Sequence, residues 1–415
     1  MVRLRGFQEL TPIDQALRVF FESFVIKKPH AESVPLDLAL HRVLARPIIA
    51  EESIPCVNRS AVDGYAVKAE FTTDTRQSKP KIMELTNMAK VGSGQAKRLW
   101  TGNPIPKGSD AVVMLENTKE FSGKVEVGAQ VTPWENVSRI GEDIRKGTVA
   151  LEAGTRLRPQ HIGLIAALGI PKVKVFKRPD IAVLATGGEL VEPSQKKPAE
   201  KIFNANSHVV SAMCRELGAN PLDLGIIGDD AAQIKEKLRM GLASDAIITS
   251  GGTSVGAPDL VPEAVNMLGK PGVIVHGIAM RPGMPAALAA VRSKPIVILP
   301  GNPVAVMVGF EVFARTLIFR LLGLKHGEPR PTLEAVMGKK ISTALGRRTF
   351  VRVRVSRKGD KYSAEPISAR GSNLISTMTR SNGFVVVPEN KEGLAEGETV
   401  TVHMFAEVEE AVADV

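Results

Sequence analysis

The sequence predicts a multidomain protein that combines a parallel α/β domain with smaller β domains, and three observations support this fold class. The chain has 415 residues, which is more than one hydrophobic core normally serves. Between residues 171 and 325, apolar strand-like runs alternate with helix-like runs, a pattern typical of a parallel sheet covered by helices. On either side, short alternating runs broken by glycine and proline indicate β structure.

The N-terminal part predicts helices around an inserted β domain. Apolar residues recur at helical spacing from residue 12 to residue 44, and residues 159–168 form a second helix-like run. Strand-like runs lie between them at residues 111–114 and 124–127. The expected domains are a discontinuous helical one at residues 1–45 and 140–170, and a small β domain inserted at residues 46–139.

Residues 171–325 predict the central α/β domain. Strands are expected at 181–185, 222–227, 246–249 and 295–299, and helices at 205–217, at 231–242 and after Pro303. Open α/β sheets bind ligands at the carboxyl ends of their strands, so the chemistry of this chain is expected there.

A proline-rich stretch then leads into residues 326–415, where alternation at 350–355 and 383–387 predicts a C-terminal β-barrel-like domain. Arg352 and Arg354 would share one strand face. Of the formal net charge of +10, residues 330–380 hold twelve Lys and Arg against three acids. This concentration favours an anionic partner, and a small oxyanion competes with nucleic acid, for which aromatic residues at 4% are scarce.

Composition excludes several other classes. Hydrophobic residues at 44%, charged residues at 24% and a mean hydropathy of +0.02 describe a soluble globular chain. No apolar run approaches the roughly 18 residues of a membrane span, and no export signal is visible, so a cytoplasmic location is expected. Cys56 and Cys214 are the two cysteines, which excludes a disulfide scaffold and a zinc finger.

Two kinds of motif could support chemistry. The glycine-rich loop at 251–256 follows a buried strand, so its backbone N–H groups could bind an anion. The same loop satisfies G-x-S-x-G, which leaves a serine hydrolase with Ser254 as nucleophile as an alternative. Carboxylates beside glycine-rich loops could hold Mg²⁺ against substrate phosphates, although Asp229, Asp259 and Asn302 could instead be helix caps.

Seven motifs occur in an order found in one family. They are NRSAVDGYA at 58–66, TGNPIP at 101–106 with DAVV at 110–113, GEDI at 141–144, TGGEL at 186–190, SGGTSVG at 250–256, RPGMP at 281–285 and LPGNP at 299–303. On these motifs the chain resembles MoeA and the gephyrin E domain, the molybdopterin molybdenumtransferases. The resemblance runs from about residue 8 to residue 410.

The resemblance implies an elongated homodimer of four-domain subunits whose α/β domain binds molybdopterin like that of MogA. It also implies the reaction: adenylylated molybdopterin receives molybdate or tungstate with Mg²⁺ as cofactor, and AMP is released. The active cleft would lie between the α/β domain of one subunit and the inserted β domain of the other. A molybdopterin adenylyltransferase becomes a possible partner, whereas membrane and nucleic acid are not expected.

The resemblance also implies roles for individual residues. The catalytic positions are Asp63, Thr101, Asp143 and Glu189, and the metal would be held by Glu189 and Asp259. The substrate-binding positions are Ser250, Gly251, Gly252, Ser254, Asp229, Pro300, Gly301 and Asn302. The oxyanion positions are Arg281, Pro285, Arg352 and Ser372, of which Arg352 and Ser372 suit a doubly charged tetrahedral anion.

Two departures from the family pattern concern the ligands. The family's common K-P-G-K-P is here RPGMP, so Met284 removes a cation from the oxyanion site. The usual T-G-D-E-L is here TGGEL, so Gly188 removes a carboxylate near the metal. These departures motivate a second hypothesis from another class, a pterin-binding scaffold of the same fold without catalysis.

Overall fold

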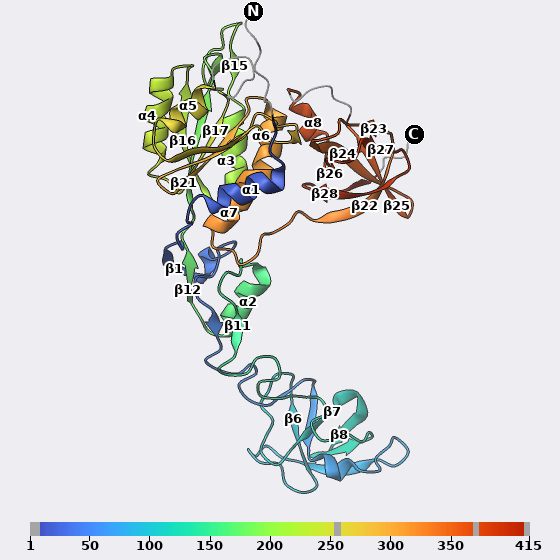
Figure 1. Ribbon diagram of the computed structural model, residues 1–415. Helices are drawn as coiled ribbons and strands as arrows, with labels where there is room; N and C mark the ends of the chain where they lie inside the picture. Colours follow the sequence, from blue (N-terminus) through green and yellow to red (C-terminus); the bar gives the residue numbers. More distant parts are fainter. Residues whose placement is uncertain (1–8, 253–258, 368–372, 411–415) are drawn as a thin grey trace, which may run out of the picture. The chain divides into compact units, whose positions relative to one another are not determined.

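The computed structural model describes residues 9–252, 259–367 and 373–410 (Figure 1). The chain divides into two compact units, one comprising Ser33–Val175 and the other Met1–Glu32 with Phe176–Val415. No helix in the described ranges is long and apolar enough to cross a membrane.

In the Ser33–Val175 unit, short elements flank the inserted β domain in the sequence. They are β1 (Ala31–Pro35) paired with β12 (Lys172–Phe176), η1 (Leu36–Leu38), β2 (Ile48–Ile49) paired with β11 (Val149–Leu151), and α2 (Pro159–Ala167). Leu44, Leu157 and Ile165 are fully buried in their common core. The helix expected at 159–168 is therefore confirmed, but most of the helix expected at 12–44 is wrong.

That helix is limited to α1 (Ile13–Glu22), and the chain turns extended at β1. Pro29 and Pro35 explain the error, because proline lacks the N–H that a helix interior needs and disfavours a helical residue before it. Because α1 belongs to the other unit, the residues around the inserted domain are less helical than expected. The predicted domain boundaries remain predictions.

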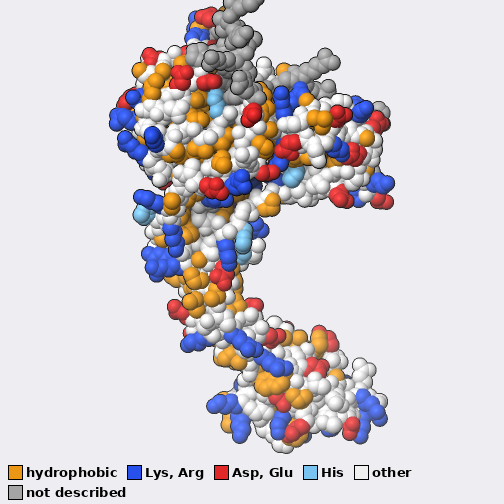
Figure 2. All heavy atoms as spheres, in the orientation of Figure 1, with side chains coloured by type: hydrophobic (Ala, Val, Ile, Leu, Met, Phe, Trp, Pro, Cys, Tyr) orange, Lys and Arg blue, Asp and Glu red, His pale blue; other side chains and the backbone are white. Residues whose placement is uncertain are grey.

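The inserted β domain is confirmed as a six-stranded sheet. Its strand order is β7 (Ala111–Met114), β4 (Gly64–Val67), β6 (Gln95–Leu99), β5 (Lys81–Leu85), β9 (Lys124–Val127) and β8 (Thr118–Phe121), with β3 (Arg59–Ser60) paired to β10 (Val137–Ser138) and short helices η2 (Ala69–Thr72) and η3 (Leu115–Asn117). A Cβ on Gly64 would lie 2.1 Å from the carbonyl oxygen of Val113, so glycine is required where β4 pairs with β7. Acidic and basic side chains are interspersed over the visible face of this domain (Figure 2).

The central domain contains a six-stranded sheet. Its order is β16 (Asn220–Ile227), β13 (Asp180–Thr186), β17 (Ala246–Ser250), β21 (Lys294–Leu299), β20 (Ala287–Val291) and β18 (Pro271–His276). The first four strands are parallel, as expected, whereas β20 and β18 form an antiparallel edge that the sequence patterns did not indicate.

Helices cover both faces of this sheet (Figure 1). On one face, α4 (Ala231–Gly241) and α5 (Leu260–Asn266) bury Leu238 and Val265 against strand residues such as Ile247. The helices α1, α3 (Asn206–Leu217), α6 (Pro303–Gly309), the π-helical turn η4 (Phe310–Ala314) and α7 (Arg315–Leu321) contact the sheet or one another elsewhere. The expected strand and helix alternation is therefore confirmed.

The C-terminal domain is a closed five-stranded barrel, which confirms the β-barrel-like domain predicted from the alternation at 350–355 and 383–387. The ring is β24 (Arg348–Lys358), β25 (Lys361–Pro366), β22 (Thr332–Met337), β28 (Thr399–Met404) and β26 (Gly383–Val387), which returns to β24. The smaller elements are β19 (Met280–Arg281), which adds to β24, β23 (Ile341–Ser342) paired with β27 (Gly393–Leu394), α8 (Ser376–Thr379) and β29 (Glu409–Glu410). Val353 and Val355 point into its core, which leaves Arg352 and Arg354 on the opposite face.

Candidate functional site

A cavity of about 890 Å³ lies at the carboxyl ends of β13, β17 and β21, and we call it the strand-end cavity. Its lining includes these substrate-binding positions predicted from the sequence: Ser250, Gly251, Gly252, Asp229, Pro300, Gly301 and Asn302. Ser254, the eighth position and the nucleophile of the hydrolase alternative, lies outside the described residues. The place of the cavity follows the general rule for open α/β sheets.

Glycines let the loops around this cavity approach one another. Gly251 has φ +93°, and a Cβ there would lie 2.2 Å from the carbonyl oxygen of Thr186. The turn after β17 therefore packs directly against the end of β13, which a larger residue would prevent. Backbone groups line the cavity as a consequence.

Two buried polar atoms in the cavity wall have no hydrogen-bond partner among the described residues. They are the Oγ of Ser250 and the Oδ1 of Asn206. The Nδ2 of Asn206 donates to the carbonyl oxygen of Gly301 at 2.7 Å, which fixes the side chain at the wall. Because buried polar groups are rarely left unpaired in native proteins, these atoms favour a polar ligand.

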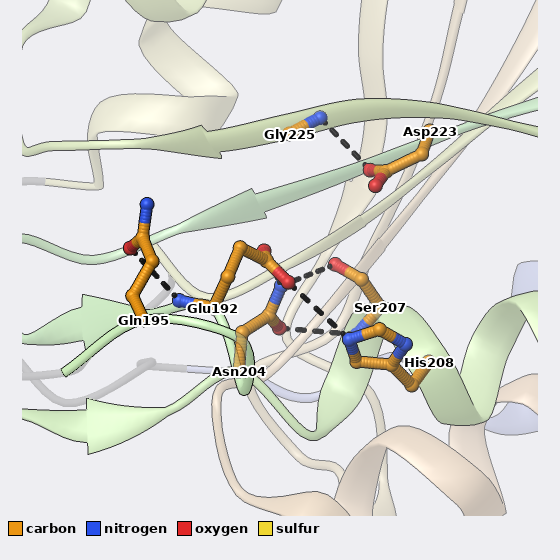
Figure 3. A network of polar contacts seen from close by, with 7 residues as sticks. All are labelled: Glu192, Gln195, Asn204, Ser207, His208, Asp223 and Gly225. Carbon is orange, nitrogen blue, oxygen red and sulfur yellow. Dashed lines mark hydrogen bonds and ion pairs between the residues drawn. The ribbon is translucent and has the colours of Figure 1, made fainter. Parts of the chain in front are cut away.

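A polar network holds the segment that leads into α3 (Figure 3). The Nδ2 of Asn204 donates to the Oε1 of Glu192 at 3.0 Å and to the Oγ of Ser207 at 3.1 Å. The Nε2 of His208 lies 3.3 Å from the Oε2 of Glu192. The network ties the paired strands β14 (Leu190–Val191) and β15 (Ile202–Phe203) to α3, and Asn204 and Phe203 both line the cavity.

Glu189 and Asp229 are brought together around one turn at the cavity. The backbone N–H of Gly188 donates to the Oδ2 of Asp229 at 3.3 Å. The carboxylate of Glu189 lies over Gly187, where a Cβ would approach it to 2.7 Å. Both carboxylates line the strand-end cavity, so the resulting acidic edge can hold a cation.

Asp259 is not part of this acidic edge. It precedes α5, and it is not in the cavity lining, although its neighbour Leu260 is. Burial raises the pKa of its carboxyl group, and attraction to His276 partly opposes this shift. Within the described residues no group of three or more His, Cys, Asp or Glu could hold a metal ion.

A second cavity, of about 710 Å³, lies where β19 pairs with β24, and we call it the cationic cavity. It brings together Arg281, Pro285 and Arg352, three of the four predicted oxyanion positions, and Met284 also lines it. Ser372, the fourth, lies outside the described residues. Pro285 lines both cavities, so they are neighbours.

Arg352 is the inner cation of this cavity. Burial lowers the pKa of its guanidinium, and its Nε has no hydrogen-bond partner among the described residues. An anion beside it would offset the cost of burying its charge.

Asp63 and Thr101 meet in the inserted β domain. The Oδ1 of Asp63 accepts hydrogen bonds from the backbone N–H and from the hydroxyl of Thr101, each at 2.7 Å. These two bonds hold the pKa of the Asp63 carboxyl below its usual value, and the bond from the backbone N–H has the larger effect. The predicted pair is therefore preorganised, with Asp63 as a carboxylate.

Asp143 is not joined to that pair. Its backbone N–H donates to the carbonyl oxygen of Ile54 at 3.1 Å, in the turn after Gly141. Within the described residues no hydrogen bond or ion pair links its exposed side chain to Asp63 or Thr101.

Sequence reasoning missed several residues of both cavities. Asn206 is the first residue of α3 and lies in none of the seven motifs on which the family resemblance rests. Lys339, Lys340 and Arg347 line the cationic cavity, and the only signal in the sequence was the general excess of positive charge at residues 330–380.

Comparisons with known proteins cover nearly the whole chain. Family models match the MoeA N-terminal region (domain I and II) at residues 11–169, a molybdopterin binding domain at 182–320 and the MoeA C-terminal region (domain IV) at 334–405. A Methanocaldococcus jannaschii protein named for molybdopterin biosynthesis is 35% identical over 97% of this chain and 100% of its own length. The molybdopterin molybdenumtransferase of Bacillus subtilis is 34% identical over 95% of this chain and 94% of its own length.

A solved structure has the same fold. The crystal structure of the molybdopterin biosynthesis MoeA protein from Pyrococcus horikoshii OT3 matches with a TM-score of 0.79 and 30% identity, covering 96% of this chain and 100% of that chain.

Proposed function

Because this chain belongs to the MoeA family, we propose that it is a molybdopterin molybdenumtransferase of molybdenum cofactor biosynthesis. In its reaction, molybdate or tungstate is inserted into adenylylated molybdopterin and AMP is released. The observation that supports this most is the pair of neighbouring cavities, one lined by backbone and polar groups at the strand ends and one by cations. A pterin phosphate and a metal oxyanion need these two kinds of surroundings.

We assign the strand-end cavity to the pterin substrate. Ser250 and Asn206 each offer a buried polar atom, and the turn at Gly251 and Gly252 offers backbone groups without side chains in the way. The cavity is large enough for a drug-sized ligand, for which volumes of roughly 300–1,000 Å³ are usual. Arg281 and Arg352 would hold the oxyanion beside it.

A Mg²⁺ ion fits the acidic edge. Mg²⁺ is commonly bound by one or two carboxylates together with substrate phosphates, and Glu189 and Asp229 supply two carboxylates at one turn. When bound, the ion would neutralise phosphate charge and polarise the phosphoanhydride. Asp259, which the resemblance also implied as a ligand, remains a prediction for that role.

Asp63 and Thr101 are proposed as catalytic residues of the inserted domain. A carboxylate held by two hydrogen bonds is suited to orient water or a cation during attack on the phosphoanhydride. The homodimer, the cleft between subunits, the adenylyltransferase partner and the cytoplasmic location remain predictions from the resemblance and composition.

The test is AMP release from adenylylated molybdopterin with Mg²⁺, without oxyanion, with molybdate and with tungstate. The wild type, Asp63→Ala and the exposed control Glu84→Ala in the same domain would be compared. Release that needs oxyanion and Asp63 supports the transferase. Tight pterin binding without release would favour the scaffold hypothesis, and labelling of Ser254 by a fluorophosphonate would favour the hydrolase.

A further inference from the structure

The cationic cavity holds more positive charge than the predicted oxyanion residues supply. Its lining includes five cations, and no carboxylate occurs among its described lining residues. The five are Arg281, Lys339, Lys340, Arg347 and Arg352. The cavity volume of about 710 Å³ also exceeds the space that one tetrahedral oxyanion fills.

None of these five cations forms an ion pair within the described residues. Their neighbour Arg348 shows the usual alternative, because its guanidinium pairs with Asp14 at 2.7 Å and with Glu389 at 3.0 Å. Cations that form no ion pair, gathered in one cavity, create a positive potential that favours an anion.

The cations lie at two depths. Arg352 is half-buried on β24, whereas the predicted oxyanion residue Arg281 and the three further cations Lys339, Lys340 and Arg347 are exposed. Lys339 and Lys340 lie between β22 and β23, and Arg347 immediately precedes β24. Lys339, Lys340 and Arg347 therefore form an outer rim around Arg352, the inner anchor. Thr349 adds a buried hydroxyl-bearing residue to the wall on the inner side.

We propose that Lys339, Lys340 and Arg347 form a cationic rim that draws the tetrahedral dianion into the cavity and contributes to its affinity, while Arg352 anchors it. Met284 lines the same wall without a charge, and three of the five cations in the lining belong to the rim. The inference rests on the proposed function for the identity of the anion.

The test is direct binding of tungstate to the full chain, measured by equilibrium dialysis without pterin. The double variant Lys339→Gln/Lys340→Gln is compared with Lys235→Gln/Lys237→Gln on α4, which removes the same charge outside the cavity. Arg347→Gln and the anchor variant Arg352→Gln complete the set. Each protein is measured at about 50 and about 200 mM chloride, because salt screens exposed charges.

We expect the rim double variant to bind roughly tenfold more weakly at low salt, with a smaller difference at high salt. The α4 control should match the wild type, Arg347→Gln should lose about threefold, and Arg352→Gln should lose most of its binding. Wild-type affinity in the rim double variant, or equal loss in the α4 control, would overturn the rim.

The outcome separates this inference from the proposed function. A wild type that binds tungstate through the rim but releases no AMP supports the rim and contradicts the transferase. A wild type that releases AMP, together with a rim variant of unchanged tungstate affinity, supports the transferase and contradicts the rim. Absence of tungstate binding to the wild type overturns the rim.

Discussion

Replacing Ser250 with alanine should stabilise the free protein and weaken ligand binding. The side chain is 3% exposed, and its Oγ has no hydrogen-bond partner among the described residues. A buried, unpaired hydroxyl costs about 1–3 kcal/mol relative to a paired or absent one. Because Ser250 lines the strand-end cavity, a bound ligand would supply the missing partner.

The neighbouring residue provides a matched control. Thr249 is fully buried, and its Oγ1 also has no partner among the described residues, but it does not line the cavity. Thr249→Val keeps the side-chain shape and removes the hydroxyl. Both variants should therefore gain about 1 kcal/mol of unfolding free energy, the lower end of that range, or about 2–4 °C in Tm. Only Ser250→Ala should bind molybdopterin more weakly, by roughly tenfold or ~1.4 kcal/mol.

The two quantities are measured separately. Circular dichroism at increasing temperature gives Tm for each variant, and pterin fluorescence gives the dissociation constant of molybdopterin. A lower Tm with unchanged affinity in Ser250→Ala would refute the reasoning. Equal loss of affinity in both variants would show that the cavity-facing position of Ser250 is not the cause.

Three further predictions concern the inserted β domain. Gly64→Ala should lower the Tm of the inserted domain by several degrees, because the new Cβ would lie 2.1 Å from the carbonyl oxygen of Val113. An unchanged melting curve would contradict the need for glycine at this position. Thr101→Val should raise the pKa of Asp63 and reduce AMP release, as NMR titration and turnover at several pH values would show, and an unmoved pKa would exclude the hydroxyl's influence. Burial raises the pKa of Tyr65 to about 12. With the other tyrosine replaced by phenylalanine, absorbance titration should therefore show Tyr65 ionising near pH 12, and folding stability should fall between roughly pH 10 and 12. Ionisation near pH 10 would refute this effect of burial.

Local patterns predicted the elements that form from neighbouring residues. The strand expected at 246–249 is confirmed as β17. Its apolar run ends at a glycine turn, and a continuous apolar run is typical of a strand that is buried on both faces of a sheet. The helix expected at 12–44 ends at Glu22, because Pro29 and Pro35 prevent a helix from continuing even though apolar residues recur at helical spacing. The antiparallel strand β20 was missed, since its alanine-rich run carries little strand preference of its own.

The candidate site was predictable only where a motif carried it. Ser250, Gly251 and Asp229 stand in or near glycine-rich turns, and they line one cavity. Asn206 and Lys339 reach the cavities through tertiary packing, because α3 and the barrel loops come from distant parts of the chain. No spacing within a single segment could have indicated that proximity.

Pro285 is common to the walls of both cavities, and this has a thermodynamic consequence. A ligand that shifts this residue in one cavity reshapes the other, so the two binding equilibria become linked. Linkage is reciprocal: if the oxyanion changes pterin affinity by some factor, the pterin changes oxyanion affinity by the same factor. The order in which the two substrates bind would then alter the path but not the stability of the ternary complex.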